Sequence, residues 1–224
     1  MHLRTGRRPV TWRALSEARR YVLWALLADL VIALSGRRAG GVTASTALAS
    51  LLFFRDPERP LEPEAGTIYA PADGVVAGVD ETGDAWVPNG ALRVSTFLSI
   101  HNVHVIRSPF AGTVTAAEDA EGGFAPAFLA RSGKNLRRRL AIDGNSGRVV
   151  LVLTAGMVAR KITSWTEVGS AVSAGERVGL IHLGSRTEVL LPAGSFEALV
   201  APGQRVRAGV TPIAARSPRG EVGS

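Results

Sequence analysis

The chain contains no cysteine. Disulfide bonds, thiol nucleophiles and zinc sites built on thiolates are therefore excluded, and any nucleophile must be another kind of residue. Lysine is also scarce, with only Lys134 and Lys161 present. A biotinyl or lipoyl carrier module must present a lysine at the tip of a tight hairpin. Lys134 belongs to a basic run and Lys161 to an alternating apolar segment, so a carrier module is the less favoured alternative.

The composition is that of a folded protein with an uneven distribution of charge. The 224 residues are 46% hydrophobic, which is enough to bury a sizeable core, and the formal net charge is +7. Residues 1–20 contain six arginines and a single glutamate. The basic stretch leads directly into an apolar one and lacks the alternating aromatic residues of a stacking platform. It therefore indicates an anionic membrane surface rather than a nucleic acid.

Two apolar segments follow, at residues 21–34 and 42–54, joined by a turn rich in glycine and arginine. Each is shorter than the roughly 20 residues that cross a bilayer unaided, so we expect a helical hairpin that enters one leaflet, or two short tilted spans. Asp29, inside the first segment, favours a shallow or protein-facing position. A signal peptide and a buried soluble helix pair are the alternatives. The basic N-terminus favours the cytoplasmic side, so we expect a cell-membrane protein whose catalytic domain lies in the cytoplasm.

A proline-rich segment separates this hairpin from the rest of the chain. Pro57, Pro60 and Pro63 cannot continue a helix, so the predicted domains are residues 1–54, 55–215 and a disordered tail at 216–224. The middle domain alternates short valine-rich runs with Gly, Pro and Asp, which predicts many short strands. Two pairs of segments resemble each other: APADGVV (70–76) with SPFAGTV (108–114), and VGSAVSAGERV (168–178) with APGQRVRAG (201–209). Such repeats predict a mainly β fold, a sandwich or barrel of related hairpins like those of biotinyl and lipoyl domains.

The residues able to do chemistry are few. His101 and His104 are three positions apart and would point to opposite faces of a strand, so no metal site is expected. Asp73, His104 and Ser185 each lie beside a turn signal. An aspartate that orients a histidine, and a histidine that takes a serine proton, form a nucleophilic triad, although the sequence does not show that the three meet. Gly184, before the serine, leaves its carbonyl uncrowded and permits a strained turn.

Five motifs occur in the order found in a known family. They are PADG (71–74), HNVH followed by RSP (101–104 and 107–109), GMVARKI (156–162), GERVG (175–179) and LGSR (183–186). In this order they resemble phosphatidylserine decarboxylases, most closely the short bacterial and archaeal branch, over roughly residues 50–210. The apolar N-terminal hairpin is similar to the membrane anchor of that branch.

The resemblance implies a self-processing enzyme that uses a pyruvoyl group. Ser185 would attack the Gly184 carbonyl to give an ester, and elimination and hydrolysis would leave a pyruvoyl group at the start of the C-terminal fragment. The products would be a β chain of residues 1–184 and an α chain of residues 185–224, held together as a heterodimer. By resemblance, His104 is the base for this cleavage and Asp73 its orienting partner.

The same resemblance implies the second reaction. The pyruvoyl group would form a Schiff base with the amine of phosphatidylserine, act as an electron sink while carbon dioxide leaves, and yield phosphatidylethanolamine. His101 is the candidate for contacting the substrate carboxylate or delivering a proton, and His182 is the alternative.

The basic run at residues 131–139 supplies the candidates for binding the lipid phosphate, namely Arg131, Lys134, Arg137 and Arg138. Arginine's planar fork suits phosphate oxygens, whereas the alternative is a solvated loop. An uncleaved lipid-binding paralogue with the same fold is a further alternative.

Overall fold

The computed structural model describes residues 11–120, 122, 135–145, 147–156, 161–182 and 185–217. The chain divides into two compact units, Met1–Glu58 and Arg59–Ser224. The division falls within the proline-rich segment that the sequence predicts as a linker.

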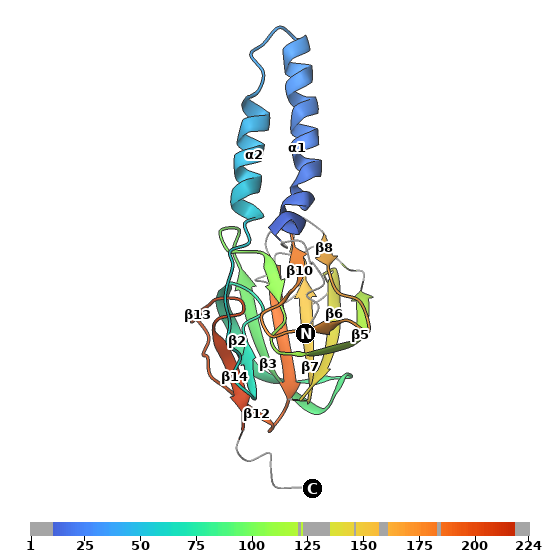
Figure 1. Ribbon diagram of the computed structural model, residues 1–224, viewed down its shortest axis with the longest axis vertical. Helices are drawn as coiled ribbons and strands as arrows, with labels where there is room; N and C mark the ends of the chain where they lie inside the picture. The colour runs from blue at the N-terminus through green and yellow to red at the C-terminus, as the bar shows by residue number, and fades with distance from the viewer. Residues whose placement is uncertain are drawn as a thin grey trace, which may run out of the picture. The chain divides into compact units, whose positions relative to one another are not determined.

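The first unit is a helical hairpin made of α1 (Thr11–Leu34) and α2 (Gly41–Phe53) (Figure 1). Helix α1 begins earlier than the predicted residue 21 and thus continues the apolar segment backward into the basic N-terminal region. Many apolar side chains of the hairpin are exposed, among them Leu34 at 80% and Trp24 at 72%. No helix within the described residues is long and apolar enough to cross a membrane.

Asp29 connects the two helices of this unit. Its side chain is buried, and its carboxylate accepts the backbone N–H groups of Thr43 at 2.8 Å and Val42 at 3.4 Å. These N–H groups lie in the first turn of α2, where no intrahelical partner is available, so the carboxylate takes the place of a helix cap. The acidic residue in the apolar segment therefore faces protein, in agreement with the sequence-based expectation.

The described residues of the second unit form antiparallel strands in three sheets (Figure 1). The strands are β1 (Thr67–Tyr69), β2 (Gly74–Asp84), β3 (Val87–Leu98), β4 (Val105–Arg107), β5 (Gly112–Ala120), β6 (Arg137–Gly144), β7 (Gly147–Thr154), β8 (Ile162–Ser164), β9 (Ala171–Val172), β10 (Arg177–Ile181), β11 (Ser185–Pro192), β12 (Phe196–Ala198), β13 (Arg205–Val206) and β14 (Pro212–Arg216). The large sheet has the order β13-β2-β3-β11-β7-β6-β5-β9, and the two small sheets have the orders β1-β14-β12 and β4-β10-β8. The prediction of a mainly β fold is confirmed.

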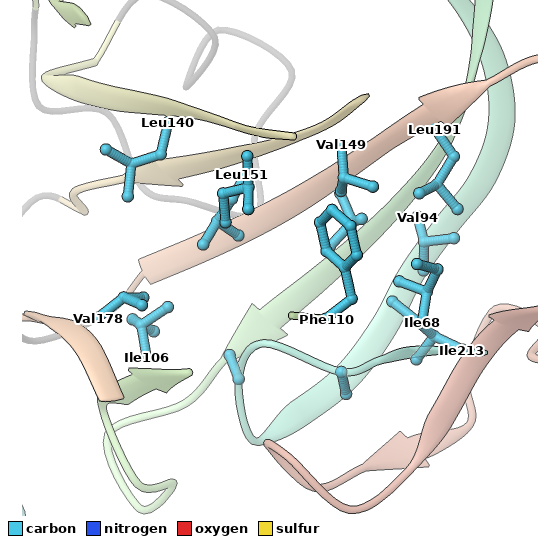
Figure 2. Packing of buried hydrophobic residues seen from close by; sticks show 14 of the residues in the cluster. Ile68, Val94, Ile106, Phe110, Leu140, Val149, Leu151, Val178, Leu191 and Ile213 are labelled. Atoms are coloured by element: carbon cyan, nitrogen blue, oxygen red, sulfur yellow. The ribbon is translucent and has the colours of Figure 1, made fainter. Parts of the chain in front are cut away.

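One face of the large sheet forms the main core. Leu151, Val149 and Leu191 project from it toward Ile106 and Ile68 of the small sheets, as Figure 2 shows. The opposite face carries a smaller apolar cluster, which contains Val150, Val152 and Leu190 with Trp86 packed against them. The alternation along β7 and β11 thus places one side chain in the core and the next on this second face, which we call the outer face.

The sequence repeats correspond to a reciprocal contact in the structure. Tyr69 N–H donates to Pro109 O and Arg107 N–H donates to Pro71 O, both at 2.8 Å. Each donor lies two residues from the proline of its own repeat, so the two PxxG segments bond each other in the manner of a local two-fold axis. The expected relation between these hairpins is therefore present in the hydrogen-bond pattern.

The second pair of repeats packs against the first. Gly175 N–H donates to Ser108 O, and Gly209 N–H donates to Ala70 O. Both glycines have positive φ, 72° and 64°, and a Cβ on Gly209 would lie 3.2 Å from Gly175 Cα. The two glycine turns therefore meet at the centre of the repeat, where side chains other than hydrogen would strain the backbone.

The C-terminal end of the domain differs slightly from the prediction. The predicted tail begins at Arg216, whereas in the structure Arg216 is the last residue of β14, and Ser217 N–H donates to Ser195 O at 2.9 Å. The pairing of β14 with β1 and β12 extends order to these residues. The rest of the predicted tail, residues 218–224, lies outside the described residues.

A substitution of Gly74, the first residue of β2, tests how closely β2 packs against β3. A Cβ at this position would lie 2.1 Å from Phe97 O, so Gly74→Ala must displace backbone. We expect a loss of stability of about 1–3 kcal/mol, measured by urea unfolding. Gly78→Ala on the same strand is the matched control, because its Cβ would have nothing within 4 Å. Equal stabilities of the two variants would contradict this packing.

Candidate active site

Ser185 is the first residue of β11, in the middle of the large sheet. It pairs with Leu98 at the end of β3, and β11 is hydrogen-bonded to β7 on its other side. The side chain is completely buried, and among the described residues its Oγ has no hydrogen-bond partner. Its predicted cleavage partner, Gly184, lies outside the described residues. A buried hydroxyl without a partner costs free energy, so this position is not explained by folding alone.

His104 lies at the same end of β3 as Ser185. After Leu98 the chain turns at residues 99–102, where the Asn102 side chain accepts the Ser99 N–H at 2.9 Å. His104 follows immediately before β4, is fully buried, and accepts the Ile181 N–H at its carbonyl at 3.2 Å. Ile181 ends β10, and the chain then leads to Ser185. The fold thus brings the histidine backbone beside the end of β10, four residues before Ser185 in the chain.

The hydrogen bond of the His104 ring defines its tautomer. Nδ1 lies 2.9 Å from Asn102 O. A carbonyl oxygen only accepts, so Nδ1 carries the proton. In the neutral ring Nε2 then holds the lone pair and can take a proton. This is the state required of the general base predicted from the sequence.

Asp73 has partners other than the predicted one. Its carboxylate forms a two-pronged ion pair with Arg59, at 2.5 and 2.8 Å, and accepts the Ala208 N–H at 2.8 Å. The Nδ1 position that an orienting aspartate would occupy is taken by the Asn102 carbonyl. The role of Asp73 in orienting His104 therefore stays a prediction, whereas its contacts here connect the start of β2 to the turn before β14.

The other two histidines of the domain differ in exposure. His101 lies in the turn at residues 99–102 and is exposed. His182 is fully buried after β10, with Nε2 3.4 Å from Thr163 Oγ1 and its N–H donating to Lys161 O. The turn places His101 outside and His104 inside. Among the described residues, no group of three or more potential metal ligands gathers.

The predicted phosphate-binding run is described only in part. Arg131 and Lys134 lie outside the described residues. Arg137 and Arg138 begin β6 and point to opposite faces of the large sheet, because alternate residues of a strand do so. Arg138 pairs with Asp119 at 2.7 Å, across to β5. The two arginines therefore do not act on one surface.

Sequence reasoning missed three residues beside the site. Arg59 was treated as part of the linker, yet its side chain is only 5% exposed and holds Asp73. Arg186 and Thr154 pair across β11 and β7, one residue beyond Ser185. The linker arginine next to prolines carries no local signal of burial, and the partners of Arg186 depend on strand register, so neither was visible in the sequence.

The outer face around these residues is rich in paired charges. Arg139 binds both oxygens of Asp84 at 2.7 Å and lies over the Trp86 ring, 4.4 Å from its centroid. Arg93 binds Asp80, and its hydrogen bond lowers the pKa of the Asp80 carboxyl below its usual value. Carboxylates thus neutralise these arginines.

Comparison with known proteins assigns the chain to a family. The profile of phosphatidylserine decarboxylase matches residues 47–214. The chain is 47% identical over 193 residues to a phosphatidylserine decarboxylase proenzyme of Symbiobacterium thermophilum, covering 84% of this chain and 89% of the relative. Proenzymes of the same name from Streptomyces griseus and Thermobifida fusca are each 45% identical, over 80% and 71% of this chain and 80% and 70% of their own length.

The chain belongs to the phosphatidylserine decarboxylase family. The family profile begins inside α2 and ends inside β14, so it includes the whole of the β unit up to its last strand. Asp73, His104 and Ser185 all lie within it. The resemblance inferred from the five motifs is confirmed.

We expect Arg59 to affect self-cleavage, because it holds the Asp73 carboxylate in place. Removing one partner of a buried ion pair leaves the other charge without compensation, so we expect Arg59→Gln to lower stability by about 3 kcal/mol and to slow self-cleavage. Thermal unfolding and a time course of chain cleavage measure the two effects. Arg93→Gln, which breaks a two-pronged pair at the exposed Asp80, is the control. Cleavage at the wild-type rate in Arg59→Gln would show that the position of Asp73 is not needed.

Proposed function

We propose that the protein converts phosphatidylserine to phosphatidylethanolamine and carbon dioxide after cutting its own chain between Gly184 and Ser185. The observation that carries this proposal is the state of Ser185. A fully buried hydroxyl with no hydrogen-bond partner among the described residues begins a central strand at the end of β3. His104, whose tautomer suits a base, is buried shortly after that end of β3. Family membership supplies the reaction type, because its relatives are named phosphatidylserine decarboxylase proenzymes.

The first reaction requires a base and a reactive carbonyl. A serine hydroxyl is a weak nucleophile near neutral pH and needs proton transfer to a neighbouring group. His104 serves as this base through Nε2, because its Nδ1–H is engaged by Asn102 O. The Oγ of Ser185 then adds to the preceding carbonyl carbon, the peptide C–N bond breaks, and the nitrogen takes the proton. An ester replaces the amide. Removal of the Cα proton of residue 185 would then expel Oγ as the carboxylate of Gly184, and the resulting dehydroalanine would take up water and release ammonia to leave the pyruvoyl group at the start of the α chain.

The residues at this position fit a pyruvoyl group. The serine carbon atoms are its only protein source, and a buried, orphaned side chain provides a dry position for it. When present, the group supplies the electron sink for decarboxylation. The chain's own residues then bind the substrate, exclude water and deliver a proton at the carbon that loses carbon dioxide. His101 and His182 remain the two candidates for the proton donor.

Strand pairing explains how the two products would stay together. Strand β11 would belong to the α chain, and its two neighbours, β3 and β7, to the β chain. Strand β14 would likewise remain paired with β1. Cutting before Ser185 breaks one covalent bond but leaves these ladders in place, so an α/β heterodimer is expected.

The helical hairpin is proposed to hold the enzyme at the cell membrane, with the catalytic domain in the cytoplasm. Exposed leucines, valines and a tryptophan along α1 and α2 provide an apolar surface, and the basic N-terminal stretch matches anionic lipid. Large exposed apolar areas are typical of membrane or protein contacts rather than of a solvated surface.

Intact-mass analysis tests the cleavage. We expect the wild type to appear as two chains, whereas Ser185→Ala, His104→Ala and Asp73→Ala stay uncut because each lacks a part of the cleavage machinery. His101→Ala should be cut but lose turnover. An uncut wild type that is folded would favour a lipid-binding paralogue, and normal cleavage of His104→Ala would exclude that histidine as the base. A mass increment on either lysine would indicate a carrier module instead.

Vesicle binding tests the membrane surface. Leu30 and Leu34 are 54% and 80% exposed, so charging them should not disturb a core. We expect Leu30→Glu with Leu34→Glu to reduce cosedimentation with phosphatidylserine vesicles by at least about fivefold while leaving decarboxylation of dispersed short-chain phosphatidylserine nearly unchanged. The matched control is Glu81→Gln on the β unit. Unchanged cosedimentation of the double variant would place the membrane contact elsewhere.

A further inference from the structure

A row of polar side chains crosses the outer face of the large sheet one residue beyond Ser185. Arg186 of β11 pairs with Thr154 of β7, and Thr154 pairs with Arg137 of β6. Directly paired residues of antiparallel strands share a face, and neither ladder shifts register here. The three side chains, which we call the arginine row, therefore lie side by side, with neighbouring strands about 4.8 Å apart.

The arginine row contains buried polar atoms whose hydrogen-bonding capacity is unused. Thr154 is completely buried, and its Oγ1 has no hydrogen-bond partner among the described residues. The buried Nε atoms of Arg137 and Arg186 are in the same state within that part of the chain. Unpartnered Nε atoms also occur in the ion-paired Arg138 and Arg139, so the Thr154 hydroxyl is the informative atom of the row. A buried hydroxyl is normally satisfied, and this one indicates a ligand that supplies an acceptor.

The charge of the row is also incompletely balanced. Within the described residues, Arg137 has no carboxylate within 4.0 Å. Arg186 has Glu188, but Nε and Oε1 are 3.5 Å apart, which is beyond a good charged hydrogen bond. Their neighbours Arg139 and Arg93 have close carboxylate partners on the same face. The arginine row is thus the part of this face with excess positive charge.

These features suit a phosphodiester. Two guanidinium groups can each present a pair of donors to phosphate oxygens, and a threonine hydroxyl between them adds a third kind of donor. In phosphatidylserine the phosphate is only a few covalent bonds from the amine that reacts. The Ser185 side chain points to the core face and Arg186 to the outer face, but cleavage would make residue 185 the first of its chain. An amine bound at its Cα would then lie at the end of β11, about 3.3 Å along the strand from the arginine row, and its phosphate could turn toward the outer face.

We propose that Arg137, Thr154 and Arg186 bind the phosphodiester of the phosphatidylserine headgroup. The proposal rests on the proposed function, because it assumes that the substrate amine reacts at position 185. It divides the predicted basic run: Arg137 contacts the substrate, while the pair formed by Arg138 and Asp119 lies on the other face. It also adds two residues that were not candidates from sequence.

Steady-state kinetics on the self-cleaved full chain test the arginine row. Arg137→Gln is the main variant, because it lies two strands from the cleavage site and should be cut normally. Losing a charged hydrogen bond to phosphate should raise KM for dispersed short-chain phosphatidylserine about tenfold or more, with kcat changed by less than about twofold. Thr154→Val and Arg186→Gln should act in the same direction, and Arg137→Lys should recover part of the loss.

Arg148→Gln is the matched control. It lies on β7 like Thr154 and on the same face, but at the other end of the sheet, where it pairs with Asp143. Its KM should equal that of the wild type. If Arg137→Gln also kept the wild-type KM, the proposal would be overturned.

Calorimetry with glycerophosphoethanolamine gives a readout that does not depend on turnover. The wild type should bind this headgroup, and Arg137→Gln should bind it at least about tenfold more weakly. Inorganic phosphate at matched ionic strength is the second arm: equal affinity for it would assign the row to free phosphate and contradict the proposal. If the wild type binds the headgroup through the row but releases no carbon dioxide from phosphatidylserine, the proposed function fails while the binding site stands.

Discussion

The β unit depends on one reciprocal contact, the pair of backbone hydrogen bonds between its two PxxG repeats. Tyr69 with Pro109 and Arg107 with Pro71 exchange N–H groups and carbonyls at equal distances. Proline has no N–H of its own, so its carbonyl is the group available for bonding here. The contact joins segments far apart in sequence and brings β1 and β4 together. Both small sheets therefore cover the same face of the large sheet.

This reciprocal contact also determines where the candidate catalytic residues lie. Strand β4 leads back to His104, and its partner β10 leads forward to Ser185. Asp73 lies two residues after Pro71, and Arg59 and the Ala208 N–H hold its carboxylate. The aspartate, the histidine and the serine thus all lie next to strands or turns that the reciprocal contact holds in place. A change that loosened it would disturb all three positions together.

Much of this could be predicted from local patterns, and the remainder depended on pairing. Alternating valines predicted strands, and the PxxG echoes predicted related hairpins, because both signals lie within a few residues. The burial of Arg59 and the row formed by Arg137, Thr154 and Arg186 depend on which strand lies beside which. No window of sequence contains that register. For the same reason, three separate turns in the sequence suggest a triad, whereas in the structure Asn102 O occupies the His104 Nδ1 position that the triad assigns to Asp73.

The two faces of β11 offer a reason why one strand can take part in two reactions. Ser185 and Thr187 point toward the core, where the environment is dry and rigid, and Arg186 points to the outer face, where it is 20% exposed. Self-cleavage needs a positioned hydroxyl without competing partners, and substrate binding needs charge that water and lipid headgroups can reach. Because side chains alternate along a strand, adjacent residues meet these opposite demands.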